Sequence, residues 1–239
     1  MVLASSDIHV PRFTKEFLEA MRKELDEAEP QALLLAGDVV NKGDPAGLGE
    51  FLDGLRSFYT GPLIACQGNE EYEETFDEVL SVTSGKIRWL VDKIEVLDLG
   101  GETLAIFGTK GVLERPTFWQ RTHIKDVWKI RSDEIKFIRE SLSKLRGMKA
   151  NAKVVLSHYS PTKATMVGER EKMWPEMGYP DFEKDMEVGG FDAWVHGHIH
   201  KGQVERVEVG KVMVYNVAFP ARKRPVWVIR DYHASLTDG

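Results

Sequence analysis

Residues 2–9 read VLASSDIH, an apolar run that leads directly into an aspartate and a histidine. The run at 2–5 is short and continuously apolar, which predicts a strand buried on both faces. Asp7 and His9 follow at the point where the chain leaves this strand. Side chains at positions i and i+2 of an extended chain point to the same side, so both could reach one metal ion.

The same arrangement of an apolar run followed by polar residues recurs four times. The later motifs are Gly37-Asp38 after 32–36, Gly68-Asn69-Glu70 after 62–66, Ser157-His158 after 153–156, and Gly197-His198-Ile199-His200 after 193–195. In open α/β sheets, ligands bind at the carboxyl ends of the strands. Scattered structural histidines would not follow that placement, so the motifs predict one shared site.

The first 80 residues alternate between predicted strands and helices, which indicates parallel strands joined by right-handed crossovers. Helices are expected at 14–28, 48–58 and 71–80, and a later one at 132–145 with Ser132 as its N-cap. Hairpins are expected at 94–107 and 203–217, and a last strand at 226–229. Two long irregular stretches, 108–130 and 159–190, lie near the motifs and are typical of functional loops.

The composition is that of an ordinary globular protein, with 239 residues of which 42% are hydrophobic and 29% charged. This length favours one core, so we expect a single domain over residues 1–239. The net charge of −6 argues against a broad nucleic-acid-binding surface. The single cysteine, Cys66, is expected to be buried and fits a reducing cytoplasm. We see no membrane-spanning run and no signal-peptide pattern, and therefore expect a cytoplasmic protein.

The donor groups in the motifs are carboxylates, imidazoles and one amide, with no thiolate. The seven candidate donors are Asp7, His9, Asp38, Asn69, His158, His198 and His200. Seven donors exceed the needs of one tetrahedral ion and suit two ions that share a bridging carboxylate. Oxygen and imidazole ligands favour manganese, with iron, zinc, nickel or magnesium as alternatives. Two aspartates against two dications leave a positive site, which suits an anionic phosphate ester.

Each motif has a structural explanation when it is considered alone. Asp7 and His9 could end a strand as turn formers, and Gly68-Asn69 could be a left-handed turn. A lone His158 is more often a structural histidine than a ligand. The two histidines at 198 and 200 are the strongest single signal, and the ordered set of five motifs is stronger than any member.

The ordered motifs resemble the pattern of the calcineurin-like metallophosphoesterases: D-x-H, GD, GN, H and GHxH. The resemblance covers nearly the whole chain. It implies an α/β fold in a four-layer αββα sandwich, in which two mixed β-sheets are flanked by helices. It also implies one metal ion at Asp7, His9, Asp38 and His200, and a second at Asp38, Asn69, His158 and His198. Asp38 would bridge the two ions together with a hydroxide that attacks phosphorus, and His196 would not be a ligand.

The chain departs from the family pattern at residue 70. Many members have a histidine there that acts near the leaving-group oxygen, whereas this chain has Glu70. An ionised carboxylate repels the dianion of a phosphomonoester more than the monoanion of a diester, so we expect a phosphodiesterase. A second interpretation is that Glu70 starts the following helix, where the helix dipole favours a carboxylate. The catalytic residues implied are Asp38, Asn69, Glu70 and His158.

Substrate contacts are expected from Asn69, Glu70, Tyr159 and Arg12, with Lys110 and the basic run 222–224 as further candidates. The aromatic pairs at 118–119 and 173–174 could form a lid, a base-stacking wall or a contact between copies of the chain. The leading hypothesis is a metal-dependent phosphodiesterase acting on small phosphodiesters or nucleotides. Alternatives are a phosphomonoesterase, a nuclease, which the charge disfavours, or a non-catalytic scaffold. The sequence leaves a homo-oligomer open and predicts no membrane partner.

Overall fold

The structure is a computed structural model that describes residues 1–229. Its first sheet contains five strands in the order β11-β1-β2-β3-β4. These strands are β1 (Val2–Ser5), β2 (Ala32–Ala36), β3 (Leu63–Cys66), β4 (Arg88–Trp89) and β11 (Val226–Val228). Strands β1, β2, β3 and β4 are parallel, and β11 pairs antiparallel with β1 at one edge of the sheet. The continuous burial of β1, β2 and β3 agrees with their continuously apolar sequences.

The second sheet contains six strands in the order β5-β6-β7-β8-β10-β9. They are β5 (Lys93–Asp98), β6 (Thr103–Thr109), β7 (Ala152–Ser157), β8 (Ala193–His196), β9 (Arg206–Val209) and β10 (Val212–Asn216). The four central strands are parallel, and both edge strands, β5 and β9, are antiparallel hairpin partners. Both predicted hairpins are therefore confirmed.

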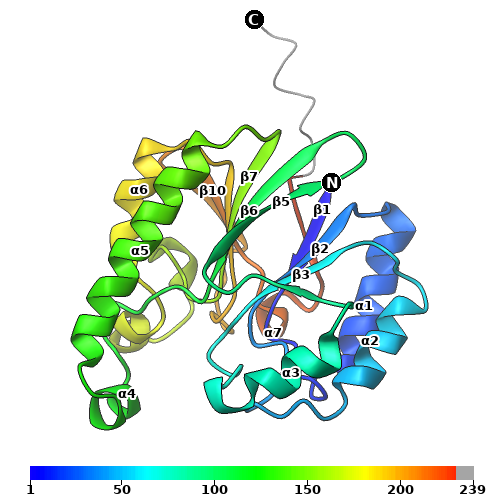
Figure 1. The fold of residues 1–239 in the computed structure, drawn as a ribbon, viewed down its shortest axis with the longest axis horizontal. Helices are drawn as coiled ribbons and strands as arrows, with labels where there is room; N and C mark the ends of the chain where they lie inside the picture. The colour runs from blue at the N-terminus through cyan, green and yellow to red at the C-terminus, as the bar shows by residue number, and fades with distance from the viewer. Residues whose placement is uncertain (230–239) are drawn as a thin grey trace, which may run out of the picture.

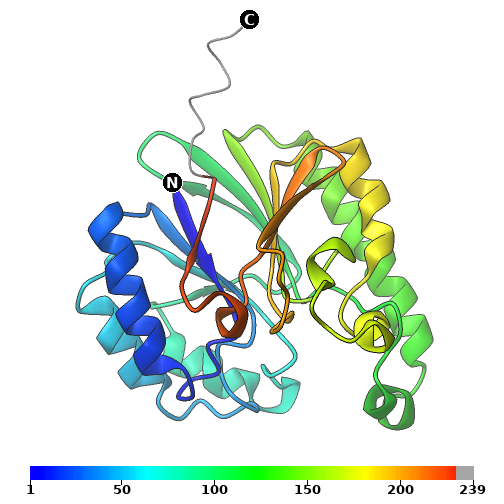
Figure 2. The same ribbon diagram turned by 180° about the vertical axis from the view of Figure 1, so that it is seen from behind.

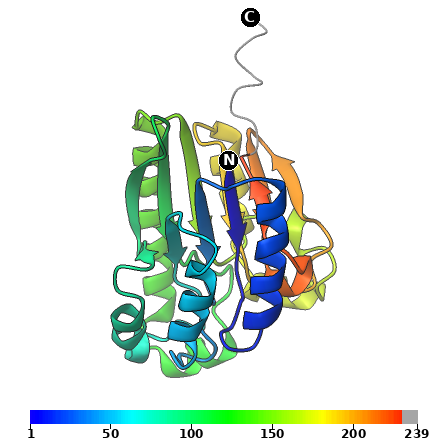
Figure 3. The same cartoon turned by 90° about the vertical axis from the view of Figure 1, so that its right-hand side faces the viewer.

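Helices cover the outer face of each sheet (Figure 1). The first sheet carries α1 (Thr14–Glu27), α2 (Leu48–Arg56) and α3 (Phe76–Thr83), and the second carries α5 (Val127–Gly147) and α6 (Glu183–Val188). Figure 3 shows β1, β2 and β3 running behind α1 and α2. Two short helices, α4 (Phe118–His123) and α7 (Phe219–Arg222), lie apart from these layers, and Figure 2 shows α7 between the end of β1 and the second sheet.

Three apolar cores hold the four layers together. In β2, Leu33 and Leu35 pack against the helices of the first sheet, whereas Leu34 faces the second sheet. In β7, Val154 faces the first sheet and Val155 packs against α5. This alternation follows from the period of two in a strand, because each strand is buried on both faces. The arrangement confirms the expected αββα sandwich with two mixed sheets.

The structure corrects two helix boundaries. The predicted helix at 71–80 is a 3₁₀ turn, Glu73–Thr75, followed by α3 from Phe76. Helix α5 begins at Val127, after a left-handed Asp126, so Ser132 lies inside the helix and is not its N-cap. Trp128 and Ile130 of the first turns are exposed, so the buried periodicity that marks a helix starts later than the helix itself.

The long stretches expected to be irregular contain short elements. Segment 108–130 includes α4, and segment 159–190 includes α6 and the 3₁₀ turns Ala164–Met166, Glu171–Glu176 and Pro180–Phe182. The two-residue strand β4 was also not predicted. Such elements are too short for a periodicity to be visible in the sequence. Cys66 is buried, as expected. Within residues 1–229, no helix is both long and apolar enough to cross a bilayer.

Candidate metal centre

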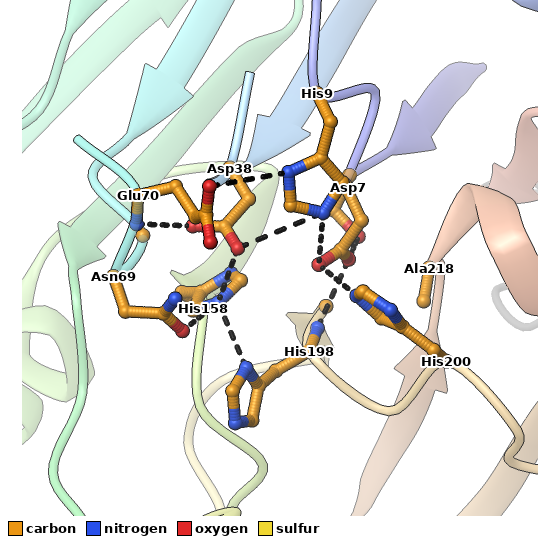
Figure 4. A network of polar contacts seen from close by, with 12 residues as sticks. Asp7, His9, Asp38, Asn69, Glu70, His158, His198, His200 and Ala218 are labelled. Carbon is orange, nitrogen blue, oxygen red and sulfur yellow. Dashed lines mark hydrogen bonds and ion pairs between the residues drawn. The ribbon is translucent and has the colours of Figure 1, made fainter. Parts of the chain in front are cut away.

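The five motifs follow β1, β2, β3, β7 and β8, and their side chains meet where the carboxyl ends of the two sheets come together (Figure 4). The structure thus brings all seven predicted donor residues into one cluster. Three overlapping groups of histidine and carboxylate donors have spacings suited to an ion: Asp7, His9 and His200; Asp7, Asp38 and His158; and His9, Asp38 and Glu70.

The first half of the cluster is built around Asp7. Its Oδ1 lies 2.7 Å from His200 Nε2 and 4.0 Å from His9 Nε2. His9 Nε2 also lies 3.9 Å from Asp38 Oδ2. These four residues are the set that the sequence resemblance assigns to one metal ion, and they face one another in the structure (Figure 4).

The second half is centred on His158 Nε2. This nitrogen lies 3.0 Å from Asn69 Oδ1, 3.1 Å from His198 Nδ1 and 3.4 Å from Asp38 Oδ2. Donor atoms bound to one ion at about 2.1 Å are separated from each other by roughly 3–3.5 Å. The three other residues of the second expected ligand set therefore each lie at such a distance from His158 Nε2.

A hydrogen bond on the far side of the His158 ring makes its nitrogen that faces the cluster an acceptor. His158 Nδ1 is 3.0 Å from the carbonyl oxygen of Ala36, so it carries the proton and leaves Nε2 with a lone pair. Burial lowers the pKa of His158 to about 4 and that of His198 to about 3, so both rings are neutral near pH 7. Two neutral imidazoles, the Asn69 amide oxygen and the Asp38 carboxyl group thus converge, and these are donor types that a cation can bind.

Asp38 connects the two halves. Its Oδ1 accepts a hydrogen bond from the Glu70 N–H at 2.8 Å, and its Oδ2 faces both His9 and His158. Burial, and then the charges of Glu71 and Asp7, raise the pKa of Asp38 well above its usual range. A carboxylate in this position is unfavourable without positive charge beside it, and divalent ions supply that charge.

Asp7 titrates in the opposite direction. Burial acts to raise its pKa, but the hydrogen bond from His200, the charge of His200 and the hydrogen bond from Ser6 contribute to a net lowering. Asp7 Oδ2 is further fixed by the Ser6 hydroxyl and by the His198 N–H, at 2.5 and 3.0 Å. The carboxylate is therefore ionised and held in place before any ion binds.

His9 gives the clearest indication that the cluster binds an ion. Its ring is buried, and among the described residues neither Nδ1 nor Nε2 has a hydrogen-bond partner. A buried polar atom without a partner costs about 1–3 kcal/mol. That cost is removed if a ring nitrogen coordinates a metal ion, so the residues present fit the expected dimetal group.

The backbone of the motifs is strained where the donors sit. Asp7, His9, Asp38 and His198 all have positive φ angles, of 56°, 45°, 50° and 66°. This left-handed region is costly for residues other than glycine and is concentrated at functional sites. The strain turns each side chain away from the direction of its strand and into the cluster.

Glu70 lies at the rim of the cluster and does not begin a helix. Its side chain is 22% exposed, with Oε2 3.9 Å from His9 Nδ1 and 2.5 Å from the Lys42 backbone nitrogen, whose N–H it accepts. The nearest helical element starts at Glu73. The helix-dipole interpretation of Glu70 is therefore wrong, and its carboxylate belongs to the site.

Glu71 is a structural residue of the site that sequence reasoning missed. Its buried carboxylate accepts four backbone N–H groups, from Gly68 at 2.5 Å, Asp38 at 2.8 Å, Val39 at 2.7 Å and Val40 at 3.1 Å. It thereby ties the loop after β2 to the loop after β3. From the sequence it was expected only to start a helix, and the available signal was an acidic residue directly after the third motif.

Replacing Glu71 with glutamine is expected to destabilise the metal-free protein by about 3 kcal/mol, because glutamine offers one acceptor oxygen and an NH₂ group that faces N–H donors. The measurement is urea unfolding of metal-free protein, with the exposed Glu73→Gln as control. A variant with wild-type stability would show that the four hydrogen bonds do not hold the two loops together.

Three further residues are placed as follows. His196 is fully buried, and its Nε2 lies 2.9 Å from the Thr165 hydroxyl, so its exclusion from the metal ligands stays a prediction. Tyr159 is buried with its ring 5.0 Å from His198 and 5.4 Å from His158. Arg12 is exposed beside His9, with its guanidinium 4.9 Å from the ring of Phe13. Substrate contacts by Tyr159 and Arg12 stay predictions.

Comparisons with known proteins find relatives of the same fold. A family model for calcineurin-like phosphoesterases matches residues 1–202. The phosphopantetheinyl hydrolase PptH from Mycobacterium tuberculosis superposes with a TM-score of 0.62 at 14% identity, over 94% of this chain and 95% of that one. TT1561 of Thermus thermophilus superposes with a TM-score of 0.55 at 15% sequence identity, over 90% of this chain and 87% of that one. GAP50, described as the anchor in the inner membrane complex of Plasmodium, superposes with a TM-score of 0.57 at 12% sequence identity, over 92% of this chain and 71% of that one. A search of curated protein sequences finds no match.

The fold and the converging donors are those of a metal-dependent phosphoester hydrolase. Because the family model covers 202 of 239 residues, the chain belongs to the calcineurin-like phosphoesterase family. This membership confirms the resemblance stated from the motifs. It also implies a dimetal centre, for which the described residues include candidate ligands, and a phosphate-ester substrate.

Proposed function

We propose that this protein is a dimetal phosphodiesterase that hydrolyses small phosphodiesters, including nucleotides. One ion would be held by Asp7, His9, Asp38 and His200, and the other by Asp38, Asn69, His158 and His198. The observation that supports this most strongly is the buried ring of His9. Within residues 1–229 neither of its nitrogens has a hydrogen-bond partner, although the carboxyl oxygens of Asp7 and Asp38 lie 4.0 and 3.9 Å from Nε2.

When bound, a pair of divalent ions supplies a nucleophile at neutral pH and stabilises charge on the phosphate oxygens. The protein contributes the positions of the ligands. Asp38 presents Oδ2 to both halves while the Glu70 N–H holds Oδ1, and Asn69 adds an oxygen without adding negative charge. Two aspartates against two dications leave the centre positive, which favours binding of a phosphate group.

Glu70 supports a diester over a monoester. Its carboxylate stands at the rim 3.9 Å from His9, and the backbone N–H of Lys42 keeps it there. A phosphomonoester brings two negative charges to this rim at neutral pH, whereas a diester brings one. The expected repulsion is therefore weaker for a diester.

Manganese as the native ion and a cytoplasmic location are parts of the same proposal. Manganese is supported by the mixture of carboxylate, amide and imidazole donors. The location is supported by the single cysteine, Cys66, which is buried in the core between the two sheets.

The test is hydrolysis of bis-p-nitrophenyl phosphate and p-nitrophenyl phosphate by metal-stripped protein, with and without added Mn²⁺. We expect turnover that depends on Mn²⁺ and favours the diester. Glu70→Gln should keep its metal content and shift the ratio of kcat/KM values toward the monoester by about tenfold, roughly 1.4 kcal/mol.

The matched control is Glu73→Gln, which replaces an exposed carboxylate three residues away. If the wild-type protein preferred the monoester, or if Glu70→Gln left the ratio of kcat/KM values unchanged, the role given to Glu70 would be contradicted. Absence of turnover on both esters, with no ion bound after purification and incubation with Mn²⁺, would contradict the proposed activity itself.

A further inference from the structure

Two cations converge on one aromatic ring beside the metal centre. The Arg12 guanidinium carbon lies 4.9 Å from the centroid of the Phe13 ring, and Lys223 Nζ lies 5.6 Å from the same centroid. The Phe13 ring in turn is 6.5 Å from the ring of His9. Residues 12 and 223 are far apart in the sequence, so the fold brings these charges together next to the Asp7 half of the cluster.

The positions of both residues are fixed by the loops that build the site. The Arg12 N–H donates to the carbonyl of His9 at 2.6 Å, so Arg12 sits one tight turn after the first motif. Lys223 ends α7 in a left-handed conformation with φ of 59°. That helix is joined to the first motif by a hydrogen bond from the Phe219 N–H to the Ser6 carbonyl at 3.0 Å.

The start of α7 also reaches the metal centre. Figure 4 shows Ala218, the residue before this helix, beside His200. Ala218 forms a parallel bridge with Ser6, directly before Asp7. Arg12 and Lys223 therefore approach the site from two segments that both border the donors Asp7, His9 and His200.

Neither cation has a counter-charge among residues 1–229. The ion pairs of this part of the chain leave out Arg12 and Lys223, although the neighbouring Arg224 pairs with Glu205 at 2.9 Å. Both side chains are exposed. Both charges lie near the same ring beside the metal centre, and a bound anion would supply a counter-charge there. A guanidinium and an ammonium together match the oxygens of a phosphate group.

We propose that Arg12 and Lys223 form an anion subsite next to the metal centre, and that the substrate is a phosphoester carrying a second phosphate group. This rests on the proposed function, since the phosphate that reacts is held at the metal cluster. The second phosphate would lie on the His9 and His200 side of the metal cluster, separated from the cluster by about the width of the Phe13 ring. The substrate class is then a bisphosphate or a pyrophosphate-bearing phosphodiester.

The test uses equilibrium binding of phosphonates, whose carbon–phosphorus bonds resist hydrolysis. Isothermal titration calorimetry on Mn²⁺-loaded protein would compare propane-1,3-diphosphonate with propylphosphonate, and methylenediphosphonate with methylphosphonate. The two pairs cover a long and a short spacing between the anionic groups. In the wild type, we expect at least one diphosphonate to bind about tenfold more tightly than its monophosphonate.

The double variant Arg12→Gln/Lys223→Gln should reduce that advantage to twofold or less. Both side chains are exposed, and Lys223→Gln alone is a second variant that should lose part of the advantage. The matched control is Arg224→Gln, which removes a neighbouring cation that already has a carboxylate partner and should keep the full advantage.

Equal binding within both pairs in the wild type would overturn the subsite, and so would an advantage that survives in the double variant. Turnover of bis-p-nitrophenyl phosphate by the same preparation reports separately on the proposed function. Loss of turnover with an intact diphosphonate advantage would reject the activity and keep the subsite. Turnover without the diphosphonate advantage would keep the activity and reject the subsite.

Discussion

Replacing Asp38 with asparagine is expected to lower kcat/KM for the preferred ester by roughly a thousandfold or more, equivalent to about 4 kcal/mol. Asparagine keeps the shape and an oxygen that accepts the Glu70 N–H at 2.8 Å. It removes the charge from the oxygen that faces both His9 and His158. Both halves of the centre lose their shared ligand at once, so the bound Mn²⁺ should fall from two ions per chain to one or none.

The same substitution should leave the metal-free protein at least as stable as the wild type. Burial and the carboxylates of Glu71 and Asp7 raise the pKa of Asp38, so the folded state disfavours its ionised form. Asparagine avoids that cost. The gain in melting temperature on adding Mn²⁺ should therefore be lost while the metal-free melting temperature stays equal or rises.

Metal analysis, thermal unfolding with and without Mn²⁺ and turnover would be measured on the variant together with Asp26→Asn. Asp26 is an exposed aspartate of α1 that lies outside every donor group of the described chain. A variant at position 38 that still binds two ions and works within tenfold of the wild type would show that Asp38 is not the bridging ligand.

The placement of the donors was predictable because it depends on short-range sequence features. A continuously apolar run such as 32–36 predicts a buried strand. A polar residue that follows the glycine directly after this run therefore lies at the carboxyl end of the strand. Parallel strands put the ends of β1, β2 and β3 at one edge of the first sheet and those of β7 and β8 at one edge of the second, whereas the approach of Asp38 to His158 also requires the two sheets to stack. The stacking of the two sheets, in contrast, was implied by the resemblance, because no local pattern states which sheet faces which.

The contacts that arise only in three dimensions were not predictable. Glu71 looks like any acidic residue before a helix, and its four acceptor bonds depend on how the loop after β2 approaches the loop after β3. The early start of α5 was missed because Trp128 and Ile130 face solvent and break the expected apolar stripe. The nearness of both Arg12 and Lys223 to the Phe13 ring likewise requires the packing of α7 against the first motif.

Gly68→Ala is expected to disable the centre from the opposite loop, through sterics alone. A Cβ at Gly68 would run into Asp38, at its backbone nitrogen and at Oδ1, both closer than real Cβ contacts allow. The backbone nitrogen cannot turn aside as the end of a flexible side chain could. Gly68 also donates its N–H to Glu71 at 2.5 Å, so a shift of the loop would disturb that anchor too. We expect a stability loss of about 2 kcal/mol and a fall in kcat/KM of roughly a hundredfold or more.

Gly49→Ala is the matched control, since the same methyl group would meet nothing within 4 Å in α2. Alanine is favoured over glycine in helices by up to about 1 kcal/mol, so this variant should be neutral or slightly more stable and fully active. Melting temperature, Mn²⁺ stoichiometry and diester turnover would be compared for the two variants and the wild type. If Gly68→Ala bound two ions and retained wild-type turnover, the loop would be able to accommodate a Cβ beside Asp38. The position of the Asp38 carboxylate would then not depend on a glycine at position 68.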